Sequence, residues 1–238
     1  MRTTCPLRNQ ARDALFPKRN PCQVANPLGF AVSSGVHRKI ESNAADLLYA
    51  LPSIIERLDL GKLFPTDQPL EVELGSGDSS FLVEYARRQP GHNFLGVERL
   101  LGRIRKLDRK GRSAGLANLR GVRIESSYFL EYLLPPHSAT ALHVYFPDPW
   151  PKRKHLRNRF INERFPSLAS QALVPGGAVY LRTDDQNYFE QMGSVFGASP
   201  LFRPVETPAD LCGLLTDFEQ GFLARGIATL RAAYRAVG

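Results

Sequence analysis

The chain has 238 residues, 43% of them hydrophobic and 23% charged, a composition that excludes both a wholly disordered chain and a fibrous protein. This length suits one sizeable domain with appendages. Lys and Arg number 31 against 23 Asp and Glu, and the resulting net charge of +8 favours a polyanionic partner such as nucleic acid. Charge alone leaves a basic surface without a partner equally open.

The cysteines Cys5, Cys22 and Cys212 form neither a CxxC pair nor an even framework. This pattern argues against a zinc site and against a disulfide-stapled secreted domain, and it predicts a reducing compartment. No apolar run approaches the roughly 18 residues that a membrane helix needs, and the start lacks the apolar centre of a signal peptide. We therefore expect a soluble, cytoplasmic protein without a metal, as a monomer or homodimer.

Residues 1–45 differ in composition from the rest of the chain. Up to residue 40 they contain a single acid, Asp13, and seven basic residues: Arg2, Arg8, Arg12, Lys18, Arg19, Arg38 and Lys39. A basic, acid-poor segment without apolar periodicity predicts a flexible N-terminal arm, although a transit peptide or a misplaced start codon remains open. The folded domain is expected over residues 46–238.

From residue 46 onward, helix and strand signals alternate. Apolar residues at helical spacing predict a first helix over residues 46–58, kinked or restarted at Pro52. Strands are then expected at residues 70–74, 93–98, 121–125, 141–146 and 178–183, and helices at 80–88, 100–111, 128–134, 160–173 and 186–196. This βαβ alternation predicts an α/β, Rossmann-like fold, in which a mostly parallel sheet carries helices on both faces.

The first strand ends in a glycine turn, and in such sheets ligands bind at strand ends. Gly75 and Gly77 permit a tight turn and a close approach of the backbone to a ligand. Glu98 ends the second strand, twenty-one positions after Gly77, and suits the hydroxyl groups of an adenosine ribose. Together these residues predict a site for a cofactor that contains adenosine.

Two cofactors with an adenosine compete for this turn. A dinucleotide would place its pyrophosphate at an uncrowded helix N-terminus. Glu73, directly before the turn, would repel phosphate but could pair with the ammonium group of a methionine moiety, and Ser80 occupies the position of the third glycine of GxGxxG. S-adenosylmethionine is therefore the better fit.

The strand at 141–146 runs into "FPDPWPKRKH", residues 146–155. Pro147, Pro149 and Pro151 fix the backbone on both sides of Asp148, so its carboxylate is held at the cofactor edge. A turn aspartate that caps backbone amides is the ordinary alternative. The prolines and the adjacent Trp150 favour a functional carboxylate.

Two basic segments adjoin this edge. One follows Asp148 and contains Lys152, Arg153, Lys154, Arg157 and Arg159; the other follows Glu98 and contains Arg103, Arg105, Lys106, Arg109, Lys110 and Arg112. Charge runs are usually solvated faces. Two of them beside one ligand edge predict the electrostatic footprint of a phosphate backbone.

From about residue 70 to its end, the chain resembles the bacterial tRNA (guanine-N7)-methyltransferases, which methylate guanine 46 of the variable loop. The matching motifs are "VELGSG" (72–77), "LGVE" (95–98), "FPDPWPKRKH" (146–155), "LRTDD" (181–185) and "TDFEQGFLARG" (216–226). The proline-flanked aspartate followed by lysines is the most specific motif. The order of all five agrees with that of the family.

This resemblance implies roles for particular residues. It assigns S-adenosylmethionine contacts to Glu73, Glu98 and Asp148, beside the turn glycines Gly75 and Gly77, with Glu125 as the nearest match to the residue that holds the adenine. It assigns tRNA contacts to Lys152, Asp184, Thr216, Asp217, Phe218 and Glu219. Within this set, Asp148 is expected to be the catalytic carboxylate, and Asp184 and Glu219 to accept from guanine N1 and N2.

Other functions stay open at this point. A Rossmann-like methyltransferase acting on protein or a small molecule would use the same cofactor turn. A tRNA-binding protein that has lost catalysis would keep the fold, although Glu73, Gly75, Gly77, Glu98 and Asp148 are all present. An NAD-dependent oxidoreductase is the most distant alternative, because it gives no reason for Glu73 or for the proline-locked Asp148.

Overall fold

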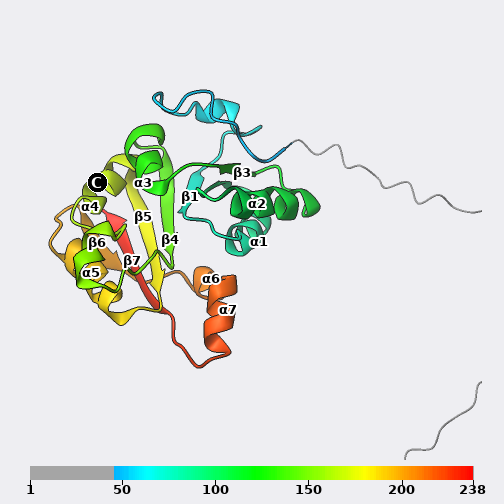
Figure 1. The fold of residues 1–238 in the computed structure, drawn as a ribbon. Helices are drawn as coiled ribbons and strands as arrows, with labels where there is room; N and C mark the ends of the chain where they lie inside the picture. The colour runs from blue at the N-terminus through cyan, green and yellow to red at the C-terminus, as the bar shows by residue number, and fades with distance from the viewer. Residues whose placement is uncertain (1–45, 238) are drawn as a thin grey trace, which may run out of the picture. The chain divides into compact units, whose positions relative to one another are not determined.

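The computed structural model describes residues 46–237, so the predicted N-terminal arm lies outside the described residues. A seven-stranded sheet runs through the structure in the order β3-β2-β1-β4-β5-β7-β6 (Figure 1). Its strands are β1 (Leu70–Leu74), β2 (Asn93–Val97), β3 (Leu119–Val122), β4 (Ala139–Tyr145), β5 (Leu173–Thr183), β6 (Phe202–Val205) and β7 (Leu230–Ala236). The first five strands pair in parallel, while β7 is antiparallel to both β5 and β6. The predicted mostly parallel sheet is therefore confirmed.

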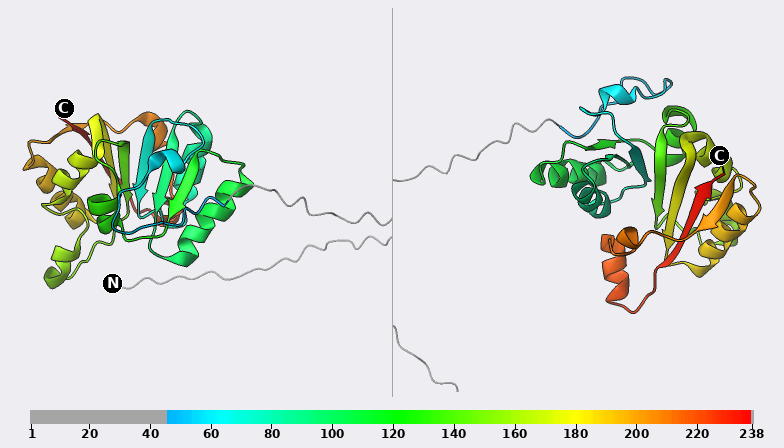
Figure 2. Two further views of the ribbon diagram at one scale, coloured as in Figure 1. Left: turned by 90° about the horizontal axis from the view of Figure 1, so that it is seen from above. Right: turned by 180° about the vertical axis from the view of Figure 1, so that it is seen from behind.

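Helices connect the strands in the predicted alternation. The α-helices are α1 (Ser80–Arg88), α2 (Leu101–Ser113), α3 (Ser126–Tyr128), α4 (Phe165–Ala172), α5 (Gln186–Gly197), α6 (Ala209–Cys212) and α7 (Asp217–Leu223). Three further turns are η1 (Leu60–Lys62), the π-helical η2 (Phe129–Leu133) and η3 (Arg153–Asn158). Figure 2 gives two further views of this arrangement.

Two apolar cores cover the two faces of the sheet. Helices α1 and α2 pack on one face around Phe81, Phe94 and Leu107. Helices α4 and α5 pack on the other face, around Phe165 and Phe196. The alternation of β1 follows from this layering, because its leucines and valine enter the α4–α5 core while its two glutamates face α1.

The glutamates of β1 are buried because both faces of a central strand are covered. The presence of two glutamates makes β1 unusual, because buried parallel strands normally consist of continuous apolar residues. Glu71 lies in the middle of the sheet, and Glu73 lies next to its carboxyl edge. The sequence of β1 thus places one carboxylate inside the fold and one beside the glycine turn.

The predicted helix over residues 46–58 is wrong. This segment is an extended strap that reaches the outer edge of β3: Tyr49 N donates to Gly121 O at 2.8 Å, and Gly121 N donates to Leu47 O at 2.9 Å. Pro52 lacks the donor that a helix would need, and Ile55 is 82% exposed, so the apolar spacing does not form one buried stripe. Backbone hydrogen bonds to β3 take the place of the hydrogen bonds that a helix would have formed in this segment.

Smaller differences concern element boundaries. The strand predicted at 121–125 ends at Val122, because Glu125 already caps α3. Helix α4 begins at Phe165 rather than at residue 160, and strand β5 begins at Leu173 rather than at residue 178. Strands β6 and β7 were not predicted. Within residues 46–237 no helix has the length and apolar character needed to cross a membrane.

Candidate active site

The turn after β1 is held by backbone hydrogen bonds and by Glu98. Gly75 and Gly77 adopt left-handed conformations, with φ of +89° and +54°. Gly75 N and Ser76 N both donate to Val97 O at 2.9 Å. The carboxylate of Glu98 accepts from Gly77 N at 3.1 Å and from Leu100 N at 2.8 Å, so it joins the turn to the start of α2. Glu98, expected from the sequence to bind the ribose, therefore also contacts the glycine turn directly.

Glu73 is the most unusual group at this edge. Its side chain is buried, and its Oε2 has no hydrogen-bond partner among the described residues. Burial raises the pKa of Glu73 well above its usual range, and the charges of Asp78 and Glu98 add to the effect, while Arg182 opposes it. A buried carboxyl oxygen without a partner is costly, so this site is built to receive a donor.

A cavity of about 550 Å³ opens between the ends of β1, β2 and β4. Its volume lies in the usual range for small-ligand sites. Three predicted carboxylates, those of Glu98, Glu125 and Asp148, line this one cavity. A smaller hollow of about 30 Å³ adjoins it and shares Gly75, Tyr145 and Phe146; Glu73, Gly77 and Thr216 also line this hollow. The structure thus brings the cofactor residues of β1, β2 and the Asp148 loop together.

The residues present fit S-adenosylmethionine. Glu73 Oε2 is a buried acceptor that would hold the methionine ammonium group, and Glu98, in contact with the glycine turn, would hold the ribose hydroxyls. Glu125 accepts from Ser127 N at 2.9 Å and from Tyr128 N at 2.8 Å, so it is fixed on the cavity wall as the cap of α3. Its contact with the adenine stays a proposal.

Asp148 lies on a strained loop at the open side of the cavity. The residues before Pro147 and Pro151 are Phe146 and Trp150, and both have left-handed φ angles, +50° and +43°. Bulky residues rarely adopt this conformation, and such strain concentrates at functional sites. Asp148 itself is exposed, and Trp150 packs edge-on against His155 with ring centroids 5.7 Å apart.

Arg159 anchors that loop from inside, which corrects its predicted role as a surface cation. It is only 2% exposed. Its Nε donates to Pro149 O at 2.7 Å, and its two terminal nitrogens donate to Gln191 Oε1 at 2.6 Å and to Asn187 Oδ1 at 2.9 Å. Arg159 is therefore a structural residue that fixes the Asp148 loop onto α5.

Helix α7 begins with a capping box. Thr216 Oγ1 accepts from Glu219 N at 3.1 Å, and Glu219 Oε2 accepts from Thr216 N at 2.8 Å. The same carboxylate accepts from Arg182 at 2.6 Å and from Arg231 at 2.7 Å. Glu219 is fully buried with both oxygens engaged, so its position does not support the predicted contact with guanine; it positions the start of α7.

The first turn of α7 also meets the glycine turn. Asp78 accepts from Lys110 Nζ at 2.6 Å and from Ser80 Oγ at 2.7 Å. A hydrogen bond between the carboxyls of Asp217 and Asp78 raises the pKa of Asp217. Burial would raise the pKa of Asp78, but hydrogen bonds from Asp217, Lys110 and Ser80 outweigh this effect and lower it. Phe218 is 51% exposed and contacts Phe146, with ring centroids 6.0 Å apart.

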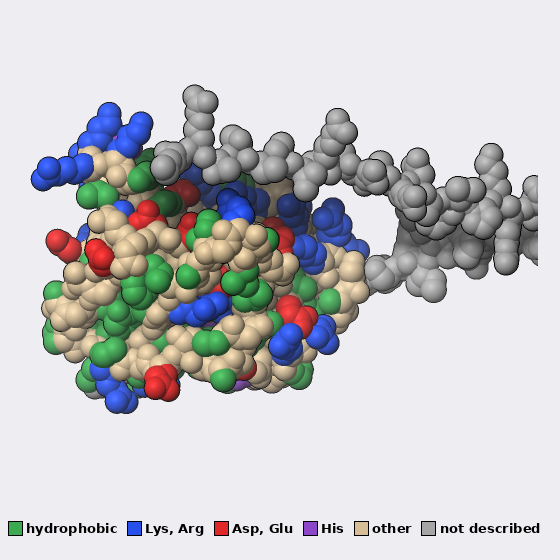
Figure 3. Space-filling model, turned by 90° about the horizontal axis from the view of Figure 1, so that it is seen from below, with side chains coloured by type: hydrophobic (Ala, Val, Ile, Leu, Met, Phe, Trp, Pro, Cys, Tyr) green, Lys and Arg blue, Asp and Glu red, His purple; other side chains and the backbone are tan. Residues whose placement is uncertain are grey.

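The other predicted tRNA residues lie outside the cavity wall. Lys152 is exposed and directly precedes η3, and Asp184 is exposed just after β5. Neither residue lines the cavity. Figure 3 shows Lys and Arg side chains gathered on a tip that projects from the body, with others in a separate group on the same face. The exposed cations of the two basic segments are Arg103, Arg105, Lys106, Arg109, Lys152, Arg153, Lys154 and Arg157.

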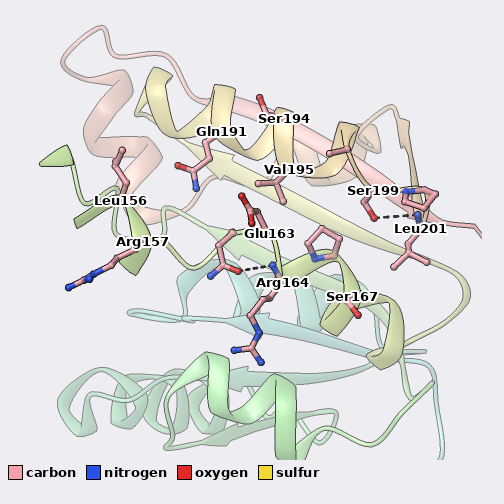
Figure 4. A pocket seen from close by; sticks show the side chains of 14 residues that line it. Leu156, Arg157, Glu163, Arg164, Ser167, Gln191, Ser194, Val195, Ser199 and Leu201 are labelled. Atoms are coloured by element: carbon pink, nitrogen blue, oxygen red, sulfur yellow. Dashed lines mark hydrogen bonds between the residues drawn. The ribbon is translucent and has the colours of Figure 1, made fainter. Parts of the chain in front are cut away.

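A second hollow of about 800 Å³ lies between η3, the start of α4 and α5 (Figure 4). It shares Arg157 and Asn162 with the cofactor cavity. Its lining is mainly apolar, with Leu156 and Val195 on its walls, and it contains none of the site residues predicted from the sequence. The predicted residues Glu98, Glu125 and Asp148 line the cavity of about 550 Å³ and not this one.

Sequence reasoning missed Arg182. It is 1% exposed and joins four elements, because it donates to Glu219, to Leu214 O at 2.7 Å and to Leu211 O at 2.6 Å, and its guanidinium lies 4.1 Å from the centre of the Tyr145 ring. A cation between Leu181 and Thr183, inside an apolar strand, was the available signal.

Comparisons with known proteins agree with this geometry. A family described as "Putative methyltransferase" matches residues 67–230. The chain is 33% identical over 180 residues to the tRNA (guanine-N(7)-)-methyltransferase of Bordetella parapertussis, covering 72% of this chain and 71% of that protein. It is 31% identical over 178 residues to the protein of the same name from Syntrophotalea carbinolica, covering 73% of this chain and 77% of that protein.

Solved structures give the fold. The 16S rRNA methyltransferase KamB superposes with a TM-score of 0.54 at 17% identity, covering 77% of this chain and 95% of that chain. The antibiotic-resistance methyltransferase Kmr gives a TM-score of 0.52 at 16% identity, over 76% of this chain and 92% of that chain. At such identities the likeness shows a methyltransferase fold alone.

Proposed function

The chain belongs to the tRNA (guanine-N7)-methyltransferase family, and from that membership we propose that it transfers a methyl group from S-adenosylmethionine to N7 of guanine 46 in the variable loop of tRNA. The observation that carries this proposal is the shared cavity of Glu98, Glu125 and Asp148, next to the unpartnered oxygen of Glu73. Binding of a positively charged cofactor and a purine requires such a set of acceptors. We further propose that the protein acts in the cytoplasm.

The reaction needs little acid–base chemistry from the chain. When bound, S-adenosylmethionine supplies an electrophilic methyl group on a sulfonium sulfur. Guanine N7 already carries a lone pair, so no residue has to remove a proton from it. The contribution of the chain is to align N7 with the methyl carbon and to exclude water, and alignment alone can lower a barrier by several kcal/mol.

Asp148 supplies the electrostatic part of the mechanism. The purine becomes cationic as it accepts the methyl group, and a fixed carboxylate beside it stabilises the developing charge. The prolines and Arg159 keep the Asp148 loop from moving away as this charge forms. Asp184 remains a candidate acceptor for the Watson–Crick edge of guanine, and Lys152 a candidate for an RNA phosphate.

The tRNA substrate follows from the exposed cations. An A-form duplex hides N7 in a deep and narrow groove, so the target must be a loop base. The cations of α2 and η3 flank the cavity on the side of Glu98 and on the side of Asp148. They are placed to bind phosphates on both sides of such a base.

Methyl incorporation from labelled S-adenosylmethionine into unmodified tRNA transcripts tests this function. We expect label in a transcript with guanine at position 46 and none in a matched transcript with adenine there. Label in both transcripts would contradict the position, and label in neither, with the cofactor bound, would contradict tRNA as the substrate.

A further inference from the structure

A chain of hydrogen bonds crosses the interior of the sheet and ends at the cofactor cavity. His92 Nδ1 lies 2.8 Å from Glu71 Oε1. Glu71 Oε2 lies 2.8 Å from His143 Nε2, and His143 Nδ1 lies 2.8 Å from the hydroxyl oxygen of Tyr145. His143 is 0% exposed. The proposed mechanism uses none of these four groups.

The direction of these hydrogen bonds follows from the charge of Glu71. Burial would raise the pKa of Glu71, but hydrogen bonds from His143 and His92 outweigh this effect and lower it. An ionised carboxylate accepts on both oxygens, so His143 Nε2 carries a proton toward Glu71. In a neutral imidazole Nδ1 is then an acceptor, and the Tyr145 hydroxyl donates to it.

The ring of His143 is held by aromatic neighbours as well as by its two hydrogen bonds. Tyr180 stacks on its ring with centroids 5.3 Å apart, and Phe81 and Tyr85 lie within 5.8 Å. The Tyr145 hydroxyl has no other hydrogen-bond partner among residues 46–237. The orientation of the Tyr145 hydroxyl therefore depends on one buried histidine.

Tyr145 stands where this interior chain meets the site. It is the last residue of β4 and lines both the cofactor cavity and the smaller hollow of Glu73. Its ring packs under the Arg182 guanidinium and against Phe81, with ring centroids 4.8 Å apart. A rotation of this ring would change the walls of both the cofactor cavity and the smaller hollow.

We propose that His143 is a positioning residue: its hydrogen bond fixes the ring of Tyr145 as a wall of the cofactor cavity, and Glu71 in turn fixes the tautomer and orientation of His143. This inference rests on the proposed function for its cofactor, and it adds two residues, His143 and Glu71, that do not touch the cavity. The same logic orients histidine ligands through a second hydrogen bond in metal sites.

A matched pair of variants separates positioning from a structural role. The amide of Asn in His143→Asn lies where Nδ1 was, and keeps a partner for Tyr145 while losing Glu71. The amide of Gln in His143→Gln lies where Nε2 was, and keeps Glu71 while losing Tyr145. Each variant loses one of the two hydrogen bonds of His143, so thermal unfolding should show similar destabilisation of both.

The affinity for S-adenosylmethionine, measured by calorimetry without RNA, should distinguish them. We expect His143→Gln and Tyr145→Phe to raise the Kd about fivefold, the factor that corresponds to one ordinary hydrogen bond. His143→Asn keeps the partner of Tyr145 and loses only the contact with Glu71, so it should raise the Kd by a clearly smaller factor. The double variant His143→Gln/Tyr145→Phe should cost no more than either single change, because the two residues act through one bond. Glu190→Gln, an exposed change on α5 outside this set of hydrogen bonds, is the control and should not alter the Kd.

Other outcomes have separate meanings. Equal Kd values for His143→Asn and His143→Gln, or an unchanged Kd in Tyr145→Phe, would overturn the inference. If the unmodified protein binds S-adenosylmethionine but does not methylate tRNA, the proposed substrate fails while the Kd comparison still decides the role of His143. If the unmodified protein does not bind S-adenosylmethionine, both proposals fail.

Discussion

The ends of β1 and β4 meet at one cavity but differ in how they hold their carboxylates. At the end of β1, Glu73 is buried without a partner, and burial raises its pKa. At the end of β4, Asp148 is exposed on a loop fixed by prolines and by Arg159. The first end therefore offers an acceptor shielded from solvent, and the second offers a carboxylate that solvent and a large substrate can reach.

The comparison of the two strand ends shows where a side-chain charge should have a large effect on stability or affinity. Buried charges interact strongly and are costly to leave unpaired, whereas exposed charges are screened by water and salt. Substitutions on the buried side should therefore change stability or affinity by larger factors than substitutions on the exposed side. Four substitutions test this ordering.

The largest effect is expected for Glu219→Gln, which leaves Arg182 buried without its carboxylate. Breaking a buried ion pair costs about 3–5 kcal/mol. The free energy of unfolding, measured with urea, should fall by that amount. Glu84→Gln is the control, because Glu84 pairs with Arg87 and Arg88 on the exposed face of α1 and should change stability by less than about 1 kcal/mol. A loss in Glu219→Gln no larger than in the control would contradict the contrast.

Glu73→Gln should have the next largest effect, on cofactor binding. A hydrogen bond between charged groups contributes about 1.5–3 kcal/mol, so the Kd for S-adenosylmethionine should rise about a hundredfold by calorimetry. Glu84→Gln again serves as the control and should bind normally. Normal affinity in Glu73→Gln would show that Glu73 does not receive the ammonium group.

The pH dependence of the free protein gives a second readout for Glu73. Its pKa is higher folded than unfolded, so the folded state holds the proton more tightly, and stability falls as pH rises between the unfolded and folded values. Glu73→Gln should flatten that decline, measured by unfolding at several pH values. Because the proposed contact with the ammonium group requires the carboxylate of Glu73, affinity should rise with pH over the same window only in the unmodified protein.

A smaller effect is expected for Asp148→Asn at the exposed end of β4. The kcat should fall about tenfold. This loss is smaller than the loss expected for a charge-stabilising group that is fully enclosed, because water can partly take over the role of the exposed Asp148 carboxylate. The Kd for S-adenosylmethionine should rise far less than in Glu73→Gln, because Asp148 is exposed. Glu190→Gln, an exposed change on α5, is the control in single-turnover assays. Normal turnover in Asp148→Asn would remove its electrostatic role.

The smallest effect is expected for Lys152→Ala. One phosphate contact should change the Kd for tRNA about threefold at moderate salt, and it should reduce the slope of log K against log salt by about one. Binding isotherms at several salt concentrations measure both quantities. A flat salt dependence of the unmodified protein would contradict phosphate binding by α2 and η3.

The sequence predicted the central sheet well because its signals are local. The alternation in β1, the helical spacing of α1 and the glycines between them each depend on a few neighbouring residues. The strap before Pro52 and strands β6 and β7 depend instead on pairing with distant strands. Apolar spacing alone could not distinguish a strap from a helix.

The site was predicted unevenly for a related reason. Glu73, Glu98 and Asp148 lie at strand ends, where chain order gives their position. The burial of Arg159, Arg182 and Glu219 could not be inferred from charge patterns, because a run of cations looks the same whether its members face water or the core. The structural roles of these three residues become visible only through their hydrogen-bond partners on α5, α6 and β7.

The two outer strands of the sheet bear on self-association. The strap covers the free edge of β3 through Tyr49 and Gly121. The free edge of β6 carries exposed Arg203 and Pro204, and proline offers no amide to a neighbouring chain. Within residues 46–237, neither rim of the sheet presents a continuous row of free backbone groups, and both rims thus carry features that oppose edge-to-edge pairing of strands.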